Sequence, residues 1–147
     1  MKNSIKYLLI GLFGFGVIGV GIAVYLFQKP PQSIKKLHPD YIVDAQSLMR
    51  EYRLDEEKAN EKYLGKILLV TGEVKAIEKS MNGSVSFSLE DVLFGITCTV
   101  NTETMDELKT RGLQIEAGDK VTLKGRCDGL LTDVRISDCV PGDLTEH

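Results

Sequence analysis

The fold is decided by the stretch Gly65-Lys-Ile-Leu-Leu-Val-Thr-Gly-Glu-Val-Lys-Ala-Ile-Glu-Lys79. The stretch is rich in aliphatic residues, as a strand is, and Gly72 interrupts it midway. A glycine inside an apolar strand is typical of a bulge or a sharp bend. A strand bent in this way can pair with a different partner along each half, which is how a small sheet closes into a barrel. We therefore expect residues 65–79 to form the first strand of a small barrel.

Two short strands with a polar outer face follow this stretch. Asn82-Gly83 is a hairpin signal, because both residues tolerate positive φ. Apolar residues then alternate with polar ones from Val85 to Leu89 and from Phe94 to Val100, so the apolar set is expected to face inward. The outward set carries only hydroxyl side chains: Ser84, Ser86, Ser88, Thr97 and Thr99.

A short helix and a last pair of strands complete the pattern. Thr104 and Glu107 have the spacing of a capping box at the start of a helix. A strand ending at Cys127, a tight turn at Asp128-Gly129 and a strand over residues 130–139 come next.

This order of elements predicts the fold class, which is mainly β (α+β). Three strands, a short helix and two strands are the composition of an OB-fold barrel. A generic five-stranded α+β roll is the alternative. We predict a five-stranded OB-fold barrel over residues 65–140, with its helix between strands 3 and 4 and a tail at 141–147.

The N-terminal part holds a candidate transmembrane segment. Residues 7–27 carry no charge, and as a helix they would span about 31 Å at about 1.5 Å per residue, close to the hydrocarbon thickness of a bilayer. A cleaved secretion signal is the alternative, but no small-x-small cleavage site follows and the first cysteine is Cys98. We predict a single-pass signal anchor that places the rest of the chain in the periplasm or outside the cell.

Two segments connect this anchor to the barrel. Pro30-Pro31 predicts a semi-rigid spacer over residues 28–37. Residues 38–64 have helical periodicity, with Asp44 and Asp55 as candidate N-caps, and are expected to pack on the barrel as a helical segment.

The charge distribution argues against an anionic partner. The chain has a net charge of −3, but from residue 37 onward thirteen basic residues face twenty-one acidic ones, a net of −8. A domain of this charge repels phosphate backbones at long range.

The sequence offers no catalytic constellation. The two histidines, His38 and His147, are badly placed to act as a base for Cys98 or for a serine. No Gly-rich phosphate loop, His pair or cysteine pair at zinc spacing occurs. We predict no catalytic, cofactor-binding or metal-binding residue, and no enzymatic activity.

The three cysteines allow one disulfide or none. As small buried hydrophobes all three would be free thiols. Cys127 and Cys139 are expected at opposite ends of one hairpin, about 30 Å apart along the strand, beyond disulfide reach. The third and fifth strands of an OB barrel are parallel neighbours, so Cys98 and Cys139 are the candidate disulfide pair, provided that a bulge turns Cys139 inward.

Several motifs resemble a known family: Tyr63-Leu-Gly-Lys66, Val70-Thr-Gly-Glu-Val74, Ile96-Thr-Cys98, Gly118-Asp-Lys-Val121, Lys124-Gly-Arg-Cys127-Asp-Gly129, and Asp133-Val134 through Asp138-Cys139. Over residues 45–139 the chain is similar to the tRNA_anti-like family. Members of this family are OB-fold proteins of bacterial envelopes, in which the barrel often follows an N-terminal anchor or lipoprotein signal. The resemblance implies a fold and a location, and it supplies no catalytic residue.

The predicted binding face has hydroxyls and few charges. OB barrels bind single strands with aromatic platforms, each worth about 1–3 kcal/mol, and here nothing aromatic is available on that face. Lys75, Lys124, Arg126 and Arg135 are either a small basic patch or ordinary surface charge. We predict a membrane-anchored binding module of the bacterial envelope, whose partner is a protein or small ligand. Binding of single-stranded nucleic acid (tRNA or an oligonucleotide) is the alternative.

Overall fold

The computed structural model describes residues 16, 18–22, 24 and 33–142, and the chain divides into two units, Met1–Gln32 and Ser33–His147. The described residues of the first unit are helical. Most of the predicted anchor at 7–27, the first half of the spacer and most of the tail lie outside the described residues. Across the described part of the chain, no helix has the length and apolar content needed to cross a membrane.

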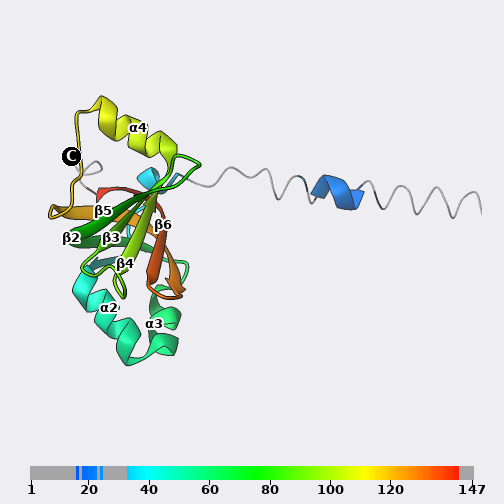
Figure 1. Ribbon diagram of the computed structural model, residues 1–147. Coiled ribbons are helices and arrows are strands. Elements are labelled where there is room, and N and C mark those ends of the chain that lie inside the picture. The colour runs from blue at the N-terminus through cyan, green and yellow to red at the C-terminus, as the bar shows by residue number, and fades with distance from the viewer. Residues whose placement is uncertain (1–15, 17, 23, 25–32, 143–147) are drawn as a thin grey trace, which may run out of the picture. The chain divides into compact units, whose positions relative to one another are not determined.

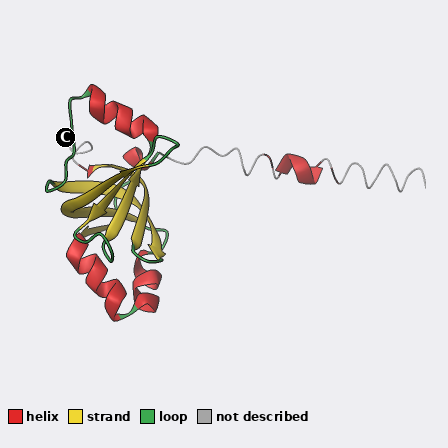
Figure 2. Ribbon diagram, viewed as in Figure 1, coloured by secondary structure: helices red, strands yellow, loops and turns green. Residues whose placement is uncertain are grey.

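The second unit contains a closed five-stranded mixed barrel, consistent with an OB fold (Figure 1). The barrel strands follow the order β2-β3-β4-β6-β5, and the pairing of β2 with β5 closes the ring. Their bounds are β2 (Ile67–Lys79), β3 (Val85–Leu89), β4 (Ile96–Val100), β5 (Lys120–Leu130) and β6 (Val134–Pro141). The helix α4 (Thr102–Thr110) lies between β4 and β5, as the sequence predicted (Figure 2).

Strand β2 has a different partner along each half, which confirms the expectation drawn from residues 65–79. Residues 67–73 pair with β5, and residues 74–79 pair with β3, with a register shift between Val74 and Ala76. Gly72 serves a packing purpose here, because a Cβ atom at this position would lie 2.8 Å from the Cβ of Ala45. The glycine therefore lets the helix that begins at Ala45, earlier in the chain, start directly against the strand.

The prediction that residues 38–64 are helical throughout was wrong at one point. Tyr41–Asp44 form β1, which pairs in parallel with β2 and makes the sheet six-stranded. The residues of Tyr41-Ile-Val are β-branched or aromatic and fit a pleated surface better than a helix.

Two helices follow β1 and pack on the barrel. The carboxylate of Asp44 accepts hydrogen bonds from the backbone N–H groups of Gln46 and Ser47 and caps α2 (Ala45–Leu54). Asp55 caps α3 (Glu56–Tyr63) in the same way. Both caps are the predicted ones. Tyr52 and Tyr63 bury their rings in the core, and the barrel interior is filled mainly by aliphatic residues and the three cysteines.

Three further expectations are corrected by the structure. Phe94 does not face inward; it lies in the β3–β4 loop with 56% of its surface exposed. Helix α4 is capped by Asn101, which accepts from the N–H of Thr104, so Thr104 is a buried helical residue and not the cap. The turn between β5 and β6 falls at residues 131–133, and Gly129, with φ of 91°, belongs to a bulge in β5.

The last part of the predicted spacer is docked on the barrel. Residues Ile34–Lys36 form a short 3₁₀ helix, η1, and Ile34 is buried with Ile67 and Val140. Residue Lys124 is only 2% exposed. Its ammonium group donates to the backbone carbonyls of Lys35 (3.2 Å) and Leu37 (3.0 Å). The spacer, where it is described, is therefore part of the folded domain.

Candidate ligand-binding groove

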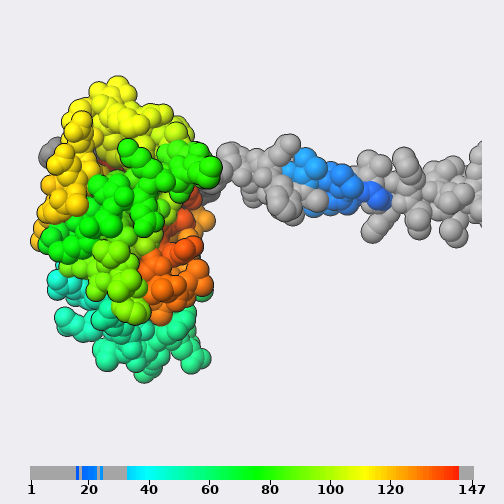
Figure 3. All heavy atoms as spheres, viewed as in Figure 1, coloured from blue at the N-terminus to red at the C-terminus, as the bar shows by residue number. Residues whose placement is uncertain are grey.

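An open groove of about 590 Å³ crosses the outer surface of β3, β4 and β6. The strands that form it lie toward the viewer in Figure 3, with β3 and β4 in green to yellow-green and β6 in orange. Its lining combines seven hydroxyl side chains, three carboxylates, one guanidinium group and three aliphatic residues: Ser80, Ser86, Ser88, Thr97, Thr99, Thr132, Ser137, Glu78, Asp128, Asp133, Arg135, Val92, Leu93 and Ile136.

The floor of the groove is the hydroxyl face predicted from strand alternation. Ser86 and Ser88 of β3 stand opposite Thr99 and Thr97 of β4, and the hydroxyl groups of Ser86 and Thr99 are 3.2 Å apart. Ser84 does not line the groove. Its hydroxyl donates to the side-chain oxygen of Asn82 within the β2–β3 loop (2.7 Å).

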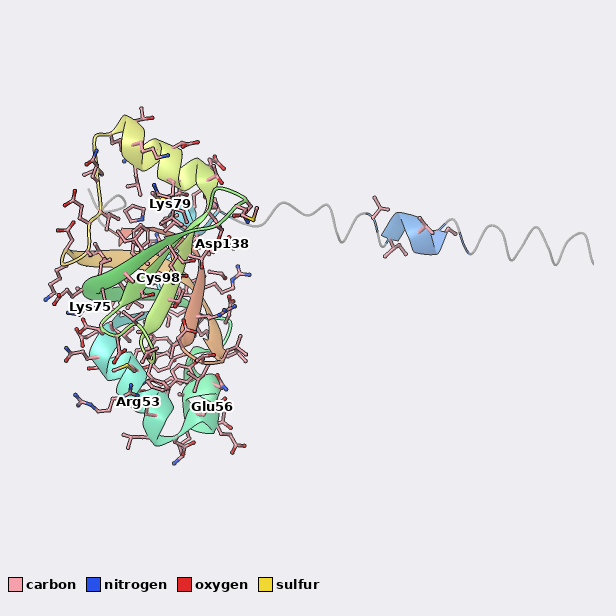
Figure 4. All side chains as sticks on the ribbon, in the orientation of Figure 1. Arg53, Glu56, Lys75, Lys79, Cys98 and Asp138 are labelled. Carbon is pink, nitrogen blue, oxygen red and sulfur yellow. The ribbon has the colours of Figure 1, made fainter. Side chains whose placement is uncertain are left out.

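The predicted basic residues do not gather into a patch. Arg135 lines the groove opposite Thr97, and its Nε lies 4.0 Å from the carboxylate of Asp133. Lys75 is paired with Glu73 (2.7 Å) and lies across the barrel from Asp138 of β6 (Figure 4). Arg126 is exposed on β5 outside the groove. The groove consequently carries more negative than positive charge.

One wall of the groove is an apolar loop with a fixed shape. Val92 and Leu93, 59% and 68% exposed, extend from the β3–β4 loop into the groove. The carboxylate of Asp91 accepts from the backbone N–H of Leu93 (2.8 Å), and this hydrogen bond lowers the pKa of Asp91. A Cβ atom at Gly95 would overlap the carbonyl oxygens of Asp91 and Leu89, so only glycine fits there.

The same loop is tied to α2. Glu90 has a φ of 65°, and its carboxylate accepts from the backbone N–H of Glu73 (3.0 Å) and the side-chain amide of Gln46 (2.9 Å). Arg53 donates to the carbonyl of Phe94 (3.3 Å) and lies over its ring. These contacts hold the apolar wall in one place relative to the barrel.

The three cysteines lie in the core as free thiols. Cys98 occupies the centre of the barrel (Figure 4), directly opposite Ile136 in the parallel pair β4–β6. A bulge at Asp138, with φ of 52°, turns Cys139 inward, as the predicted pairing required. Burial, together with the neighbouring thiol of Cys98, raises the pKa of Cys139. A disulfide between Cys98 and Cys139 remains a prediction.

Cys127 has a different partner. Its sulfur lies 3.4 Å from the hydroxyl of Tyr52, and burial raises its pKa. Gly125 of β5 is explained by its neighbours on β6, since a Cβ atom there would lie 2.6 Å from the side chain of Ile136 and 2.7 Å from the sulfur of Cys139.

The acidic and apolar parts of the groove were missed by reasoning from sequence. Asp128 was assigned to a turn, whereas it lies in the continuing strand β5 and faces the groove. Glu78 lies four positions before the predicted turn at Asn82-Gly83 and has no distinctive sequence signal. A signal for Val92 and Leu93 was present in the apolar run 92–94, but only Phe94 of this run was interpreted, as the start of a strand.

Comparison with solved structures supports the fold assignment. The crystal structure of a "putative nucleic acid-binding lipoprotein" from Klebsiella pneumoniae subsp. pneumoniae matches with a TM-score of 0.52 and 18% identity, covering 78% of this chain and 98% of that one. A putative aspartyl-tRNA synthetase from Leishmania major Friedlin has a TM-score of 0.45 and 13% identity over 82% of this chain and 23% of that one. At 18% identity the likeness to the Klebsiella structure concerns the fold alone. No curated protein matches the sequence.

The family assignment comes from the sequence as a whole. The family model described as tRNA_anti-like matches residues 1–140, a longer range than residues 45–139, over which the motifs were recognised. The chain belongs to the tRNA_anti-like family.

Proposed function

We propose that this protein is a non-catalytic binding module that holds a protein segment or a small ligand in the hydroxyl-lined groove. The observation that carries the proposal is the position of the groove. It crosses the outer faces of β3 and β4 between Ser80, at the start of the β2–β3 loop, and Thr132, in the β5–β6 turn. OB barrels bind their ligands on this face and with these two loops.

The chemistry of the groove favours binding over catalysis. A serine or threonine nucleophile needs an adjacent base. Among the residues that line the groove there is neither histidine nor cysteine, and the hydroxyl of Ser86 pairs with that of Thr99. The carboxylate of Asp133 lies 4.0 Å from Nε of Arg135. Hydroxyls with free donor and acceptor capacity are instead suited to orienting a bound polar ligand.

We also propose that residues 7–27 anchor the module in the membrane, with the barrel outside the cytoplasm. The uncharged stretch of twenty-one residues supports the membrane anchor. The native thiols are buried and unsuited to labelling, so the test uses Glu103→Cys, at an exposed position on α4. A membrane-impermeant maleimide should label this variant in intact cells. Labelling only after lysis would contradict the proposed orientation.

Nucleic-acid binding is the second candidate, because a protein with a similar fold carries the description "putative nucleic acid-binding lipoprotein". Two features of the groove oppose it: no aromatic side chain lines it, and carboxylates outnumber basic groups. Fluorescence anisotropy with single-stranded DNA and RNA at low salt should show no saturable binding. Binding that weakens steeply with added salt would favour this candidate over the leading one.

The leading proposal can be tested by photo-crosslinking in native membranes. A photoreactive residue is placed at Ser88 or Thr97 in the groove, and at Glu103 on α4 as the control. Irradiation should produce a discrete adduct from the two groove positions and none from the control. Identical patterns from all three positions, or no adduct from the groove, would overturn the proposed binding role of this face.

A further inference from the structure

The groove carries negative charge that the other residues of 33–142 do not fully neutralise. Of its three carboxylates, Asp133 has Arg135 nearby, at 4.0 Å. Glu78 and Asp128 are exposed, and neither forms an ion pair with any residue in the described part of the chain. They project from β2 and β5, on either side of the hydroxyl floor. The surrounding domain, with its net charge of −8 from residue 37 onward, strengthens the attraction of this groove for cations.

The hydroxyl floor has the repeat distance of an extended polypeptide. Ser86 and Ser88 lie two residues apart along β3, as do Thr97 and Thr99 along β4. Side chains on one face of a strand repeat at about 6.6–6.8 Å, and an extended segment laid along the groove presents its own groups at the same interval. Each hydroxyl can donate to a carbonyl and accept from an N–H group, so both kinds of backbone group would find partners.

The apolar wall adds a place for aliphatic side chains. Val92 and Leu93 are mostly exposed, although their loop is fixed by the turn at Asp91 and by the contacts of Glu90. Within residues 33–142, the segment η1 does not cover this wall. Lys35 of η1 pairs with Glu107 of α4, whereas the wall lies beside α2, at the other end of the barrel (Figure 1). Exposed aliphatic side chains on a fixed loop are suited to contacts with a partner.

We propose that the groove binds an extended polypeptide segment in which lysine or arginine alternates with aliphatic residues. The inference rests on the proposed function of the groove and names its class of partner. The basic side chains would lie near Glu78 and Asp128, the backbone would bond to the floor, and the aliphatic side chains would pack on Val92 and Leu93. The absence of aromatic residues from the lining favours this occupant over a nucleic-acid strand, which needs stacking platforms.

The test uses the full chain in a nonionic detergent and a fluorescent short peptide of alternating lysine and valine. This peptide should bind saturably, while a matched peptide of alternating glutamate and valine should not. Glu78→Gln and Asp128→Asn should each weaken binding about two- to fivefold at low salt, the range expected for exposed ion pairs. Leu93→Ser should weaken it about fivefold or more through lost apolar contact.

Two matched variants serve as controls outside the groove. Glu103→Gln removes an exposed carboxylate from α4, and Leu113→Ser removes an exposed leucine after it. Both should bind the lysine–valine peptide as the unchanged protein does, and thermal unfolding should show that every variant is folded.

Three results would overturn the inference: no saturable binding of the lysine–valine peptide, equal affinity for the glutamate–valine peptide, or an equal loss from Glu103→Gln and Glu78→Gln. In each case groove-specific crosslinking from Ser88 would leave the proposed function standing with another class of ligand. Loss of the groove-specific crosslinking would contradict the proposed binding function as well.

Discussion

The outer surface of the barrel has two contrasting faces. On one, η1 covers β5 and β6: Ile34 is buried, and Lys124 donates to two backbone carbonyls. On the other, the outward side chains of β3, β4 and β6 line an open groove, and Glu78 and Asp128 face it without a basic partner among the residues that the structure describes. The first face already has an occupant supplied by the chain itself. The second has polar groups, charge and space for an occupant from outside.

Strand β6 belongs to both faces, and the largest expected effect on stability concerns the predicted disulfide at its Cys139. If Cys98 and Cys139 form the predicted disulfide, β4 and β6 are covalently joined beneath the groove floor. The bond closes a loop of about 40 residues, so its reduction should lower the free energy of unfolding by about 4 kcal/mol. Denaturation of the native protein with and without reductant measures this difference.

Thiol titration provides the control for that prediction. Protein isolated from its host and denatured without reductant should show one reactive thiol, assigned to Cys127 by mass spectrometry. Three reactive thiols would show that the core holds no disulfide, in which case reductant should leave stability unchanged.

The covered face should be sensitive to Lys124. Lys124→Met keeps the length of the side chain but leaves the carbonyls of Lys35 and Leu37 without their donor. We expect a loss of about 2 kcal/mol in the free energy of unfolding, measured in urea. Lys75→Met, which breaks only an exposed pair with Glu73, should change it by about 0.5 kcal/mol or less. Equal effects would mean that η1 contributes little to the covered face.

The pH dependence of stability should report the burial of Lys124. Burial lowers the pKa of this ammonium group in the folded protein. Between the lowered value and the ordinary lysine value of about 10.4, the unfolded chain binds the proton and the folded one does not, so stability from this group rises with pH. The difference in unfolding free energy between the native protein and Lys124→Met should therefore grow as pH rises toward about 10. A constant difference would contradict the assignment.

The open face should tolerate substitution without loss of stability. Ser86→Ala breaks only the partly exposed hydroxyl contact with Thr99, so the expected loss is about 0.5 kcal/mol or less. The same change should weaken peptide binding, which anisotropy measures. A larger loss of stability, without a loss of binding, would show that the hydroxyl row supports the barrel and not a ligand.

Local alternation was enough to predict the hydroxyl floor, because each of Ser86, Ser88, Thr97 and Thr99 lies between buried apolar neighbours. The division of β2 between two partners followed in the same way from one long apolar stretch. Features that depend on distant contacts were not accessible. Tyr41–Asp44 became a strand because β2 offered a free edge.

The negative charge of the groove also depends on a local backbone feature that was not predicted from the sequence. Gly129 forms a bulge rather than a turn, so β5 continues through Asp128 and carries its carboxylate into the groove. Phe94 was expected inside because alternation was extended back across Gly95, where the backbone is instead held in a loop.

The shape of the apolar wall is set by the residues on either side of Val92 and Leu93 rather than by these two exposed side chains. Glu90 holds the loop from one end, Gly95 admits no side chain at the other, and Asp91 closes the turn between them. Val92 and Leu93 contribute outward side chains to a frame fixed by other residues. These two residues can therefore be exchanged without refolding the barrel, and a protein that keeps the same frame can acquire a different recognition specificity from one scaffold.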